Sequence, residues 1–140
     1  QGGAVRDTSS ADRLAGYVCH CRECQKQSAS AFGVSIPVRE EDFAITGEVK
    51  VWSRPTDSGG VTDCYFCPKC GSRLFHSGRK GREWITVKGG SLDDQSLIDF
   101  VAHIWVKRAV PWIELPVDLP AWDTQPQTMA EWKDLLGWDS

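Results

Sequence analysis

The sequence predicts an all-β domain, and three observations support this prediction. Short runs rich in β-branched and aromatic residues recur along the chain, and turn residues separate nearly all of them. No alternation of strand and helix patterns is visible, which argues against a parallel sheet built from strand-helix-strand units. A length of 140 residues is typical of one domain with a single core.

The expected strands follow one another along most of the chain. They cover residues 17–21, 32–38, 48–53, 61–66, 83–88 and 101–105, and a further strand begins near Arg73. Residues 23–30 and 129–136 have helical patterns, and the second helix follows Thr128 with Glu131 three residues on, as in a capping box. We therefore expect residues 1–127 to form the domain and residues 128–140 to form a helical extension packed on it.

Charge is dispersed along the chain. The 16 basic and 19 acidic residues are interspersed, with a net charge of −3, which argues against a nucleic-acid partner. No segment approaches the roughly 18 consecutive apolar residues of a membrane-spanning helix. Residues 1–8 lack the basic-then-apolar order of a secretion signal. We expect a cytoplasmic protein without a membrane partner, and leave open whether it forms a homo-oligomer.

The six cysteines form two tight clusters. They are Cys19, Cys21 and Cys24 in the first, and Cys64, Cys67 and Cys70 in the second. Such spacing favours metal binding over a disulfide framework. In a reducing cytoplasm the thiols stay unpaired, whereas coordination of Zn²⁺ by thiolates contributes folding free energy. The sequence therefore predicts a zinc protein.

The second cluster contains a zinc-knuckle pattern. The two residues between Cys67 and Cys70 let both sulfurs face one ion, and Gly71 suits the tight turn that follows. Cys64 lies three residues before Cys67, and strand alternation places the two on opposite faces. We predict Cys67 and Cys70 as metal ligands and leave Cys64 unassigned.

The first cluster predicts an open site. Strand alternation places Cys19 and Cys21 on one face, and a turn can bring Cys24 round to join them. Three protein ligands leave one tetrahedral position for water or substrate, as in catalytic zinc sites, so these cysteines are also the predicted catalytic residues. The alternative is one closed structural site made of Cys21, Cys24, Cys67 and Cys70.

The three histidines are predicted to be structural. His20 lies between Cys19 and Cys21 and should point away from the sulfurs, so we expect a hydrogen-bonded supporting or core histidine. His76 and His103 lie in apolar strand contexts, where no spacing marks them as ligands. We also expect most of the seven tryptophans to belong to the core.

A series of motifs in one order resembles the family of glutathione-dependent formaldehyde-activating enzymes, which includes centromere protein V. The resemblance covers nearly the whole chain. Its carriers are Gly3-Ala4-Val5-Arg6, Cys19-His20-Cys21-Arg22-Glu23-Cys24-Gln25-Lys26, Ala31-Phe32, Phe66-Cys67-Pro68-Lys69-Cys70-Gly71-Ser72, Gly90-Ser91-Leu92-Asp93-Asp94, His103-Ile104-Trp105 and Pro111-Trp112.

The resemblance implies several small coiled antiparallel sheets with a zinc-ribbon-like element, similar to the fold of a zinc-bearing Rab-binding chaperone. It implies a catalytic zinc held by Cys19, Cys21 and Cys24, and a structural zinc to which Cys67 and Cys70 belong. In the family a C-x-C just before the Gly-Ala-Val-Arg segment completes the structural site, but here Gly2 stands where its second cysteine is expected. We therefore expect one zinc and leave the second open.

The implied activity is the making or breaking of a carbon–sulfur bond, as by a lyase, between glutathione or a related thiol and a small carbonyl or imine compound. Glutathione would be a co-substrate, and Lys26, Arg73 and Lys88 are candidates to hold its carboxylates. Two alternatives without catalysis are a zinc-stabilised module that binds a protein partner and a thiol redox sensor.

Overall fold

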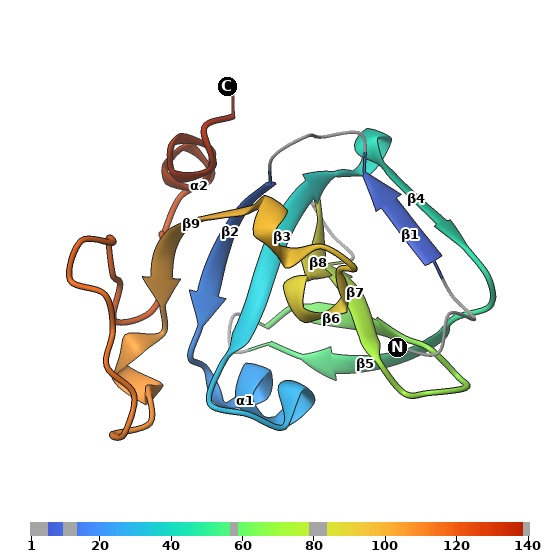
Figure 1. The fold of residues 1–140 in the computed structure, drawn as a ribbon, viewed down its shortest axis with the longest axis horizontal. Coiled ribbons are helices and arrows are strands. Elements are labelled where there is room, and N and C mark those ends of the chain that lie inside the picture. Colours follow the sequence, from blue (N-terminus) through green and yellow to red (C-terminus); the bar gives the residue numbers. More distant parts are fainter. Residues whose placement is uncertain (1–5, 10–13, 57–58, 79–83, 139–140) are drawn as a thin grey trace.

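The computed structural model describes residues 6–9, 14–56, 59–78 and 84–138, the first of these ranges by its backbone alone. Strands dominate these ranges, and two α-helices accompany them (Figure 1). The strands are β1 (Arg6–Ser9), β2 (Leu14–Cys19), β3 (Gly33–Arg39), β4 (Phe43–Thr46), β5 (Lys50–Pro55), β6 (Val61–Phe66), β7 (Arg73–Gly78), β8 (Trp84–Lys88) and β9 (Ile98–Ile104). The helices are α1 (Arg22–Ser28) and α2 (Met129–Leu136), and short 3-10 turns are Glu40–Asp42, Gly89–Ser91, Gln95–Leu97 and Val106–Arg108.

One seven-stranded sheet organises the molecule. Its strand order is β5-β6-β7-β8-β3-β2-β9, and β1 pairs with β4 in a separate two-stranded sheet. Each pair of neighbouring strands is antiparallel except β2 and β9, which run parallel. The all-β prediction is confirmed. In place of several small antiparallel sheets, the structure joins most strands into one mixed sheet, because the β5 to β8 meander continues through β3 into β2 and β9.

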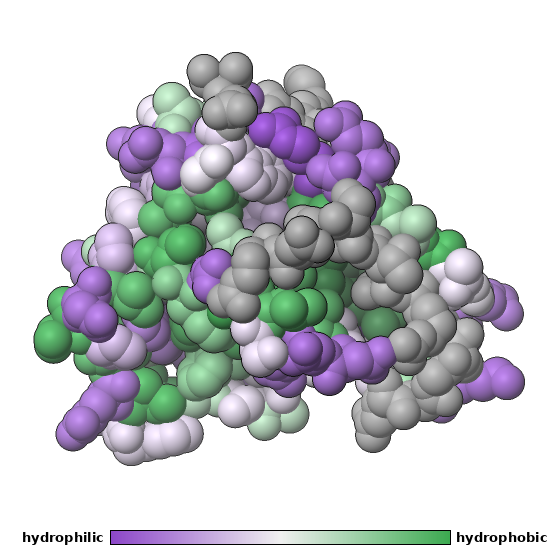
Figure 2. Space-filling model, turned by 45° about the horizontal axis from the view of Figure 1, so that its top comes forward, coloured by the Kyte–Doolittle hydropathy of each residue, from purple (hydrophilic) through white to green (hydrophobic). Residues whose placement is uncertain are grey.

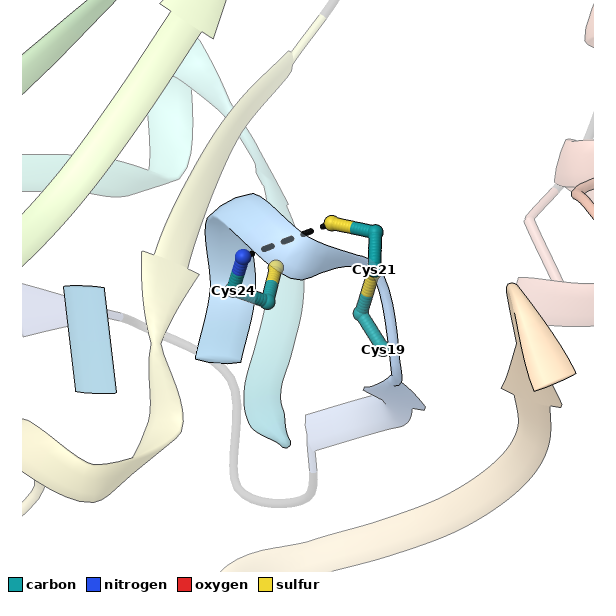
Figure 3. A group of neighbouring side chains, drawn as sticks. All are labelled: Cys19, Cys21 and Cys24. Atoms are coloured by element: carbon teal, nitrogen blue, oxygen red, sulfur yellow. Dashed lines mark hydrogen bonds between the residues drawn. The ribbon is translucent and has the colours of Figure 1, made fainter. Parts of the chain in front are cut away.

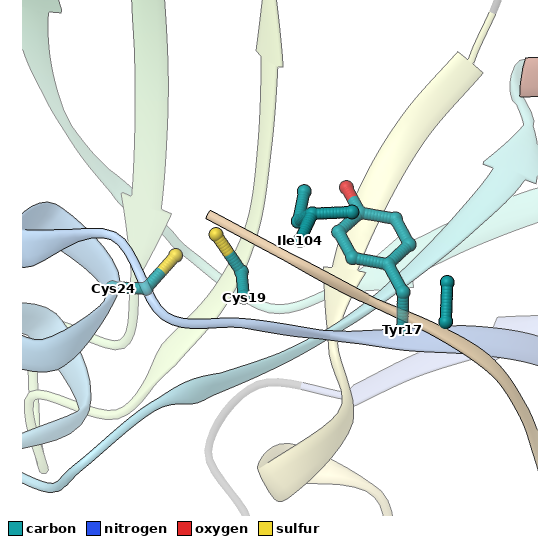
Figure 4. Close-up of a cluster of buried hydrophobic side chains, with 5 residues drawn as sticks. Tyr17, Cys19, Cys24 and Ile104 are labelled. Carbon is teal, nitrogen blue, oxygen red and sulfur yellow. The ribbon is translucent and has the colours of Figure 1, made fainter. Parts of the chain in front are cut away.

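Three clusters of buried side chains form the core. The first gathers Ile36 and Val38 of β3 with Val87 and Ile98, and the second lies around Leu74, Phe75 and Ile85. Phe43 of β4 packs against both clusters, so the small sheet covers part of the large one. The third cluster includes Tyr17, Cys19, Cys24, Ala102 and Ile104 (Figure 4). The cysteines of the first group are therefore built into the core rather than carried on a loose loop.

The C-terminal helix packs on the sheet beside β2. Thr128 caps its first turn and Glu131 completes the predicted capping box. The ring of Trp132 lies 5.2 Å from that of Tyr17 between centroids, and Leu136 is buried. In Figure 1, α1 and α2 lie at opposite ends of β2. No helix in the described ranges is long and apolar enough to cross a membrane.

Several predicted elements shift, and two strands were missed. Residues 61–66 and 129–136 match β6 and α2, whereas the strand expected at 17–21 is displaced toward the N-terminus. The missed strands are β1 and β4, which pair with one another. Each has only four residues, which is too short a run for a hydrophobic pattern to identify it. None of the seven tryptophans is fully buried, and Trp52 and Trp112 are exposed. Figure 2 shows apolar residues reaching the surface between hydrophilic ones.

Candidate metal centre

Local structure brings the first three cysteines together. Cys19 is the last residue of β2, Cys21 is the N-cap of α1, and Cys24 lies in the first turn of that helix. The Cys24 backbone N–H donates a hydrogen bond to Cys21 Sγ over 3.4 Å (Figure 3). A strand end, a cap and a first helical turn therefore place three thiols on one side of a tight bend.

The three thiols fit a single metal ion. The sulfurs of Cys19, Cys21 and Cys24 all lie within 4.8 Å of one another. Two sulfurs bound about 2.3 Å from one tetrahedral ion lie about 3.8 Å apart, so little movement is needed to close the site. Of the residues that the structure describes, only these three form such a group. Cys67 and Cys70 do not join it, so the alternative site with four cysteines is not formed here.

The thiols of Cys19 and Cys21 have pKa values shifted in opposite directions. Hydrogen bonding with Cys21 and Cys24, together with burial, raises the pKa of Cys19. Hydrogen bonds from the Cys19 and Cys24 thiols lower the pKa of Cys21, the one partly exposed member. Negative charge is therefore favoured at Cys21. Burial holds the pKa of the neighbouring Tyr17 above its usual range, so its phenol stays neutral.

His20 and His103 form a buried pair behind the cysteines. His20 Nε2 and His103 Nδ1 lie 3.0 Å apart, and the two rings stack with centroids 5.3 Å apart. Burial lowers the pKa of both imidazoles, and the proximity of His103 adds to the effect on His20. The prediction that His20 is hydrogen-bonded and is not one of the clustered ligands is confirmed. Neither its Nδ1 nor His103 Nε2 has a hydrogen-bond partner among the described residues.

A cationic hollow of about 640 Å³ adjoins Cys24. Gln27, which lines it, donates from Nε2 to Cys24 Sγ over 3.8 Å and accepts from Arg73 over 3.2 Å. Arg73 and Lys88, two of the predicted carboxylate-binding cations, line the same hollow. Lys26 lines two other, smaller hollows. The structure thus gathers two of the three predicted cations beside the cluster.

Sequence reasoning missed Gln27 and Arg54. Gln27 follows Cys24 by three residues on one helix, a spacing that places both on one face and could have identified it. The charge of Arg54 contributes to the lowered pKa of Cys21, although Arg54 lies on the distant strand β5. No spacing in the sequence indicates that Arg54 lies near Cys21.

In the second cysteine cluster, Cys67 and Cys70 flank a partly exposed turn. Gly71 N–H donates to the Cys67 carbonyl over 2.8 Å, and Gly71 adopts a positive φ of 77°. Cys67 is buried, and Cys70 packs against the same core cluster. Cys64 is buried in β6, opposite His76 of β7. All six cysteines are free thiols. Gly2 and the Gly3-Ala4-Val5 segment lie outside the described residues, so a metal role for Cys67 and Cys70 stays a prediction.

His76 makes the stability of the protein sensitive to acid. Burial, together with the charges of Lys88 and Arg54, lowers the pKa of His76 to about 3. Because an unfolded histidine has a pKa of about 6.5, the unfolded state binds the proton first as the pH falls, and stability present near pH 7 is lost. We expect His76 to contribute a loss approaching about 1.4 kcal/mol per pH unit below pH 6.

Urea unfolding of the metal-free protein from pH 7 to pH 5 measures this loss. His76→Gln should flatten the dependence, because glutamine does not titrate, while His20 and His103 account for what remains. An unchanged slope in His76→Gln would contradict the prediction.

Comparison with known proteins adds an independent finding. The family model described as glutathione-dependent formaldehyde-activating enzyme matches residues 2–108, a range that contains all six cysteines. A search of curated proteins found no match. Because the family model covers more than half of the chain and includes the three-thiol cluster, this chain belongs to the glutathione-dependent formaldehyde-activating enzyme family.

Proposed function

We propose that this protein is a zinc-dependent enzyme that makes or breaks a carbon–sulfur bond between glutathione, or a related thiol, and a small carbonyl or imine compound. One observation carries the proposal: three thiols that can share one ion lie beside a hollow lined by two cations. Family membership supports a glutathione-related activity. The lyase class, the substrate and the identity of the metal are our inference.

Cys19, Cys21 and Cys24 would hold the ion and leave its fourth position to a ligand. Zinc bound there would lower the pKa of a thiol or water ligand and polarise a carbonyl oxygen. Cys21 is the one partly exposed member of the cluster, and the hollow lined by Gln27 adjoins Cys24. Three thiolates reduce the effective charge on the ion, which favours a soft sulfur ligand over an oxygen ligand.

The chemical step needs no oxidant or reductant. In the forward direction, the thiol sulfur donates an electron pair to the carbonyl carbon, a C–S bond forms and the C=O π bond breaks. The proton lost by the thiol ends on the former carbonyl oxygen, so the product is a hemithioacetal. In the reverse direction the C–S bond breaks and the same proton returns to sulfur.

The hollow beside Cys24 matches the charges of glutathione. Glutathione carries two carboxylates and one ammonium group, and Arg73 would face a carboxylate, while Lys88 adds positive charge to the wall of the hollow near Cys24. Asp93 lines the same hollow and would face the ammonium group. Arg73 is held in place by Gln27 and by the Trp52 ring, whose centroid lies 5.7 Å from the guanidinium carbon. We therefore propose Arg73 as the main carboxylate anchor.

The purified protein should contain zinc and bind glutathione. We expect roughly one equivalent per chain, because clustered thiolates bind zinc far better than magnesium or calcium. Elemental analysis and calorimetry with glutathione on the same sample measure both. Roughly two equivalents would mean that Cys67 and Cys70 also bind an ion with further ligands. A folded sample with under about half an equivalent would overturn the proposal.

Zinc release from the same sample distinguishes an enzyme from a redox sensor. A sensor releases zinc when mild peroxide oxidises its thiols, and the lowered pKa of the partly exposed Cys21 favours such oxidation. An enzyme retains its zinc through repeated turnover with glutathione and formaldehyde. Zinc release measured during turnover and during peroxide treatment therefore distinguishes the two functions.

A further inference from the structure

Lys88, the last residue of β8, buries a positive charge in the sheet. Its side chain is only 6% exposed. The ammonium donates a hydrogen bond to Ser35 Oγ over 3.1 Å, and Ser35 is itself buried in the adjacent strand β3, where the two residues are paired in register. Lysine is almost never this buried without a partner for its charge. The position of Lys88 therefore requires an explanation.

The ammonium of Lys88 and the sulfur of Cys24 lie on two sides of Gly33. A methyl group placed on Gly33 would lie 3.5 Å from Cys24 Sγ and 3.6 Å from Lys88 Nζ, so glycine leaves a small space that both atoms border. No carboxylate among the described residues forms an ion pair with Lys88. The Cys24 thiol, which borders the same small space, is therefore a group whose negative charge this cation can balance.

The net charge of a metal-loaded cysteine cluster would explain why the charged Lys88 is buried beside it. A divalent ion with three thiolates carries a net charge of −1, which is costly in a buried environment. With the positive charge of Lys88 included, the net charge of the site is zero. When a thiolate substrate binds as the fourth ligand, the net charge of the site becomes −1 with Lys88 present and −2 without it. The Lys88 ammonium therefore also favours binding of a thiolate substrate.

We propose that Lys88 is the counter-charge of the metal centre, held beside Cys24 by Ser35, and that it strengthens binding of both the divalent ion and an anionic fourth ligand. This inference rests on the metal site of the proposed function, but not on the reaction assigned to it. Lys88 is a positioning residue in this role, because it acts through the thiolates and does not bind the ion.

The test is the metal affinity of Lys88→Met, which keeps the length and removes the charge. We expect cobalt and zinc to bind about 10- to 100-fold more weakly, the range typical when a group supporting metal ligands is lost. Competition with a chelator of known affinity measures this. The metal-free variant should unfold at the same or a higher urea concentration than the metal-free parent, because the buried unpaired ammonium is gone. A purely structural lysine would instead lower the stability of both forms.

Two more variants separate charge from hydrogen bonding and guard against misfolding. Lys88→Gln keeps a donor for Ser35 but no charge, and should bind metal as weakly as Lys88→Met. Lys88→Arg keeps the charge and should recover most of the affinity. Lys50→Met is the matched control, since Lys50 is exposed on β5 of the same sheet, and its affinity should equal that of the parent.

Three results would overturn the inference. One is cobalt binding by the neutral variants within about twofold of the parent, which would leave the proposed zinc site intact and remove the role of Lys88. Another is full affinity in Lys88→Gln, which would assign the effect to the hydrogen bond alone. A parent protein that binds no metal at all would overturn the proposed function and this inference together.

Discussion

Replacing Cys21 by serine should abolish metal binding at the three-cysteine cluster and, with it, any response to glutathione. Cys21 is the partly exposed member of the cluster and has a lowered pKa, so its loss removes the thiol of the three that most favours the thiolate form. Serine should preserve α1, because Cys21 is the N-cap that accepts from the Cys24 N–H, and serine is among the best residues there. The variant therefore separates ligand loss from unfolding.

Cobalt substitution measures this effect, since thiolate-to-cobalt charge-transfer bands report the number of sulfur ligands. The cobalt spectrum of the parent should indicate three sulfur ligands. Glutathione should strengthen the bands, because its sulfur becomes a fourth ligand of the ion. In Cys21→Ser, affinity should fall by more than the roughly hundredfold loss expected from removing a supporting group, and glutathione should change nothing. Catalytic activity should be lost with the metal.

His20→Ala is the control for this experiment. It removes a fully buried ring and should lower stability, but the number of sulfur ligands and the glutathione response should stay the same, because His20 bonds to His103 and is not one of the clustered ligands. A parent spectrum with four protein thiolates that ignores glutathione would show a closed site. The structural reading of the cluster would then replace the catalytic one.

Ile36→Ala should produce the largest loss of stability outside the metal centre. Ile36 lies in β3, between β2 and β8 in the sheet order, is 0% exposed, and packs with Val38, Val87 and Ile98. Removing its side-chain atoms forfeits burial and leaves a cavity, at a cost of about 2–5 kcal/mol. A total stability of about 5–15 kcal/mol makes this a large fraction. Urea unfolding of the metal-loaded protein measures the difference.

Two matched variants calibrate that measurement. Ile36→Val should cost about 0.5–1.5 kcal/mol, and Val117→Ala, at a fully exposed position, should stay within about 0.5 kcal/mol of the parent. The cobalt spectrum of folded Ile36→Ala should match that of the parent, since Ile36 touches no cysteine of the cluster. A loss below about 1 kcal/mol for Ile36→Ala would contradict the packing described here.

The local features of this protein were predictable because short spacing encodes them. The capping box at Thr128 and Glu131 involves residues three apart, and α2 has the predicted bounds. The convergence of Cys19, Cys21 and Cys24 likewise needs only a strand end followed by one helical turn. The convergence was predicted correctly, but the strand alternation expected to carry Cys21 was wrong, because the strand ends at Cys19 and Cys21 caps the helix.

Other features depended on pairing between distant segments. The sequence shows that β2 and β9 are strands but contains no local signal that they pair in parallel, with β9 as one edge of a single large sheet. The prediction of several small sheets failed for this reason. Strand order follows from the summed burial of many residues, and no short motif records it.

The sequence by itself determined the all-β class, the two helices and the three-thiol cluster. Only the tertiary structure decided what surrounds the cluster. Pairing of β3 with β8 places the buried Lys88 beside Cys24, and Arg73 of β7 lines the same hollow. These residues lie tens of positions away along the chain, and their approach depends on strand register and burial. The convergence of the three thiols can be read from local spacing, whereas the charged residues around them are set by which strands become neighbours.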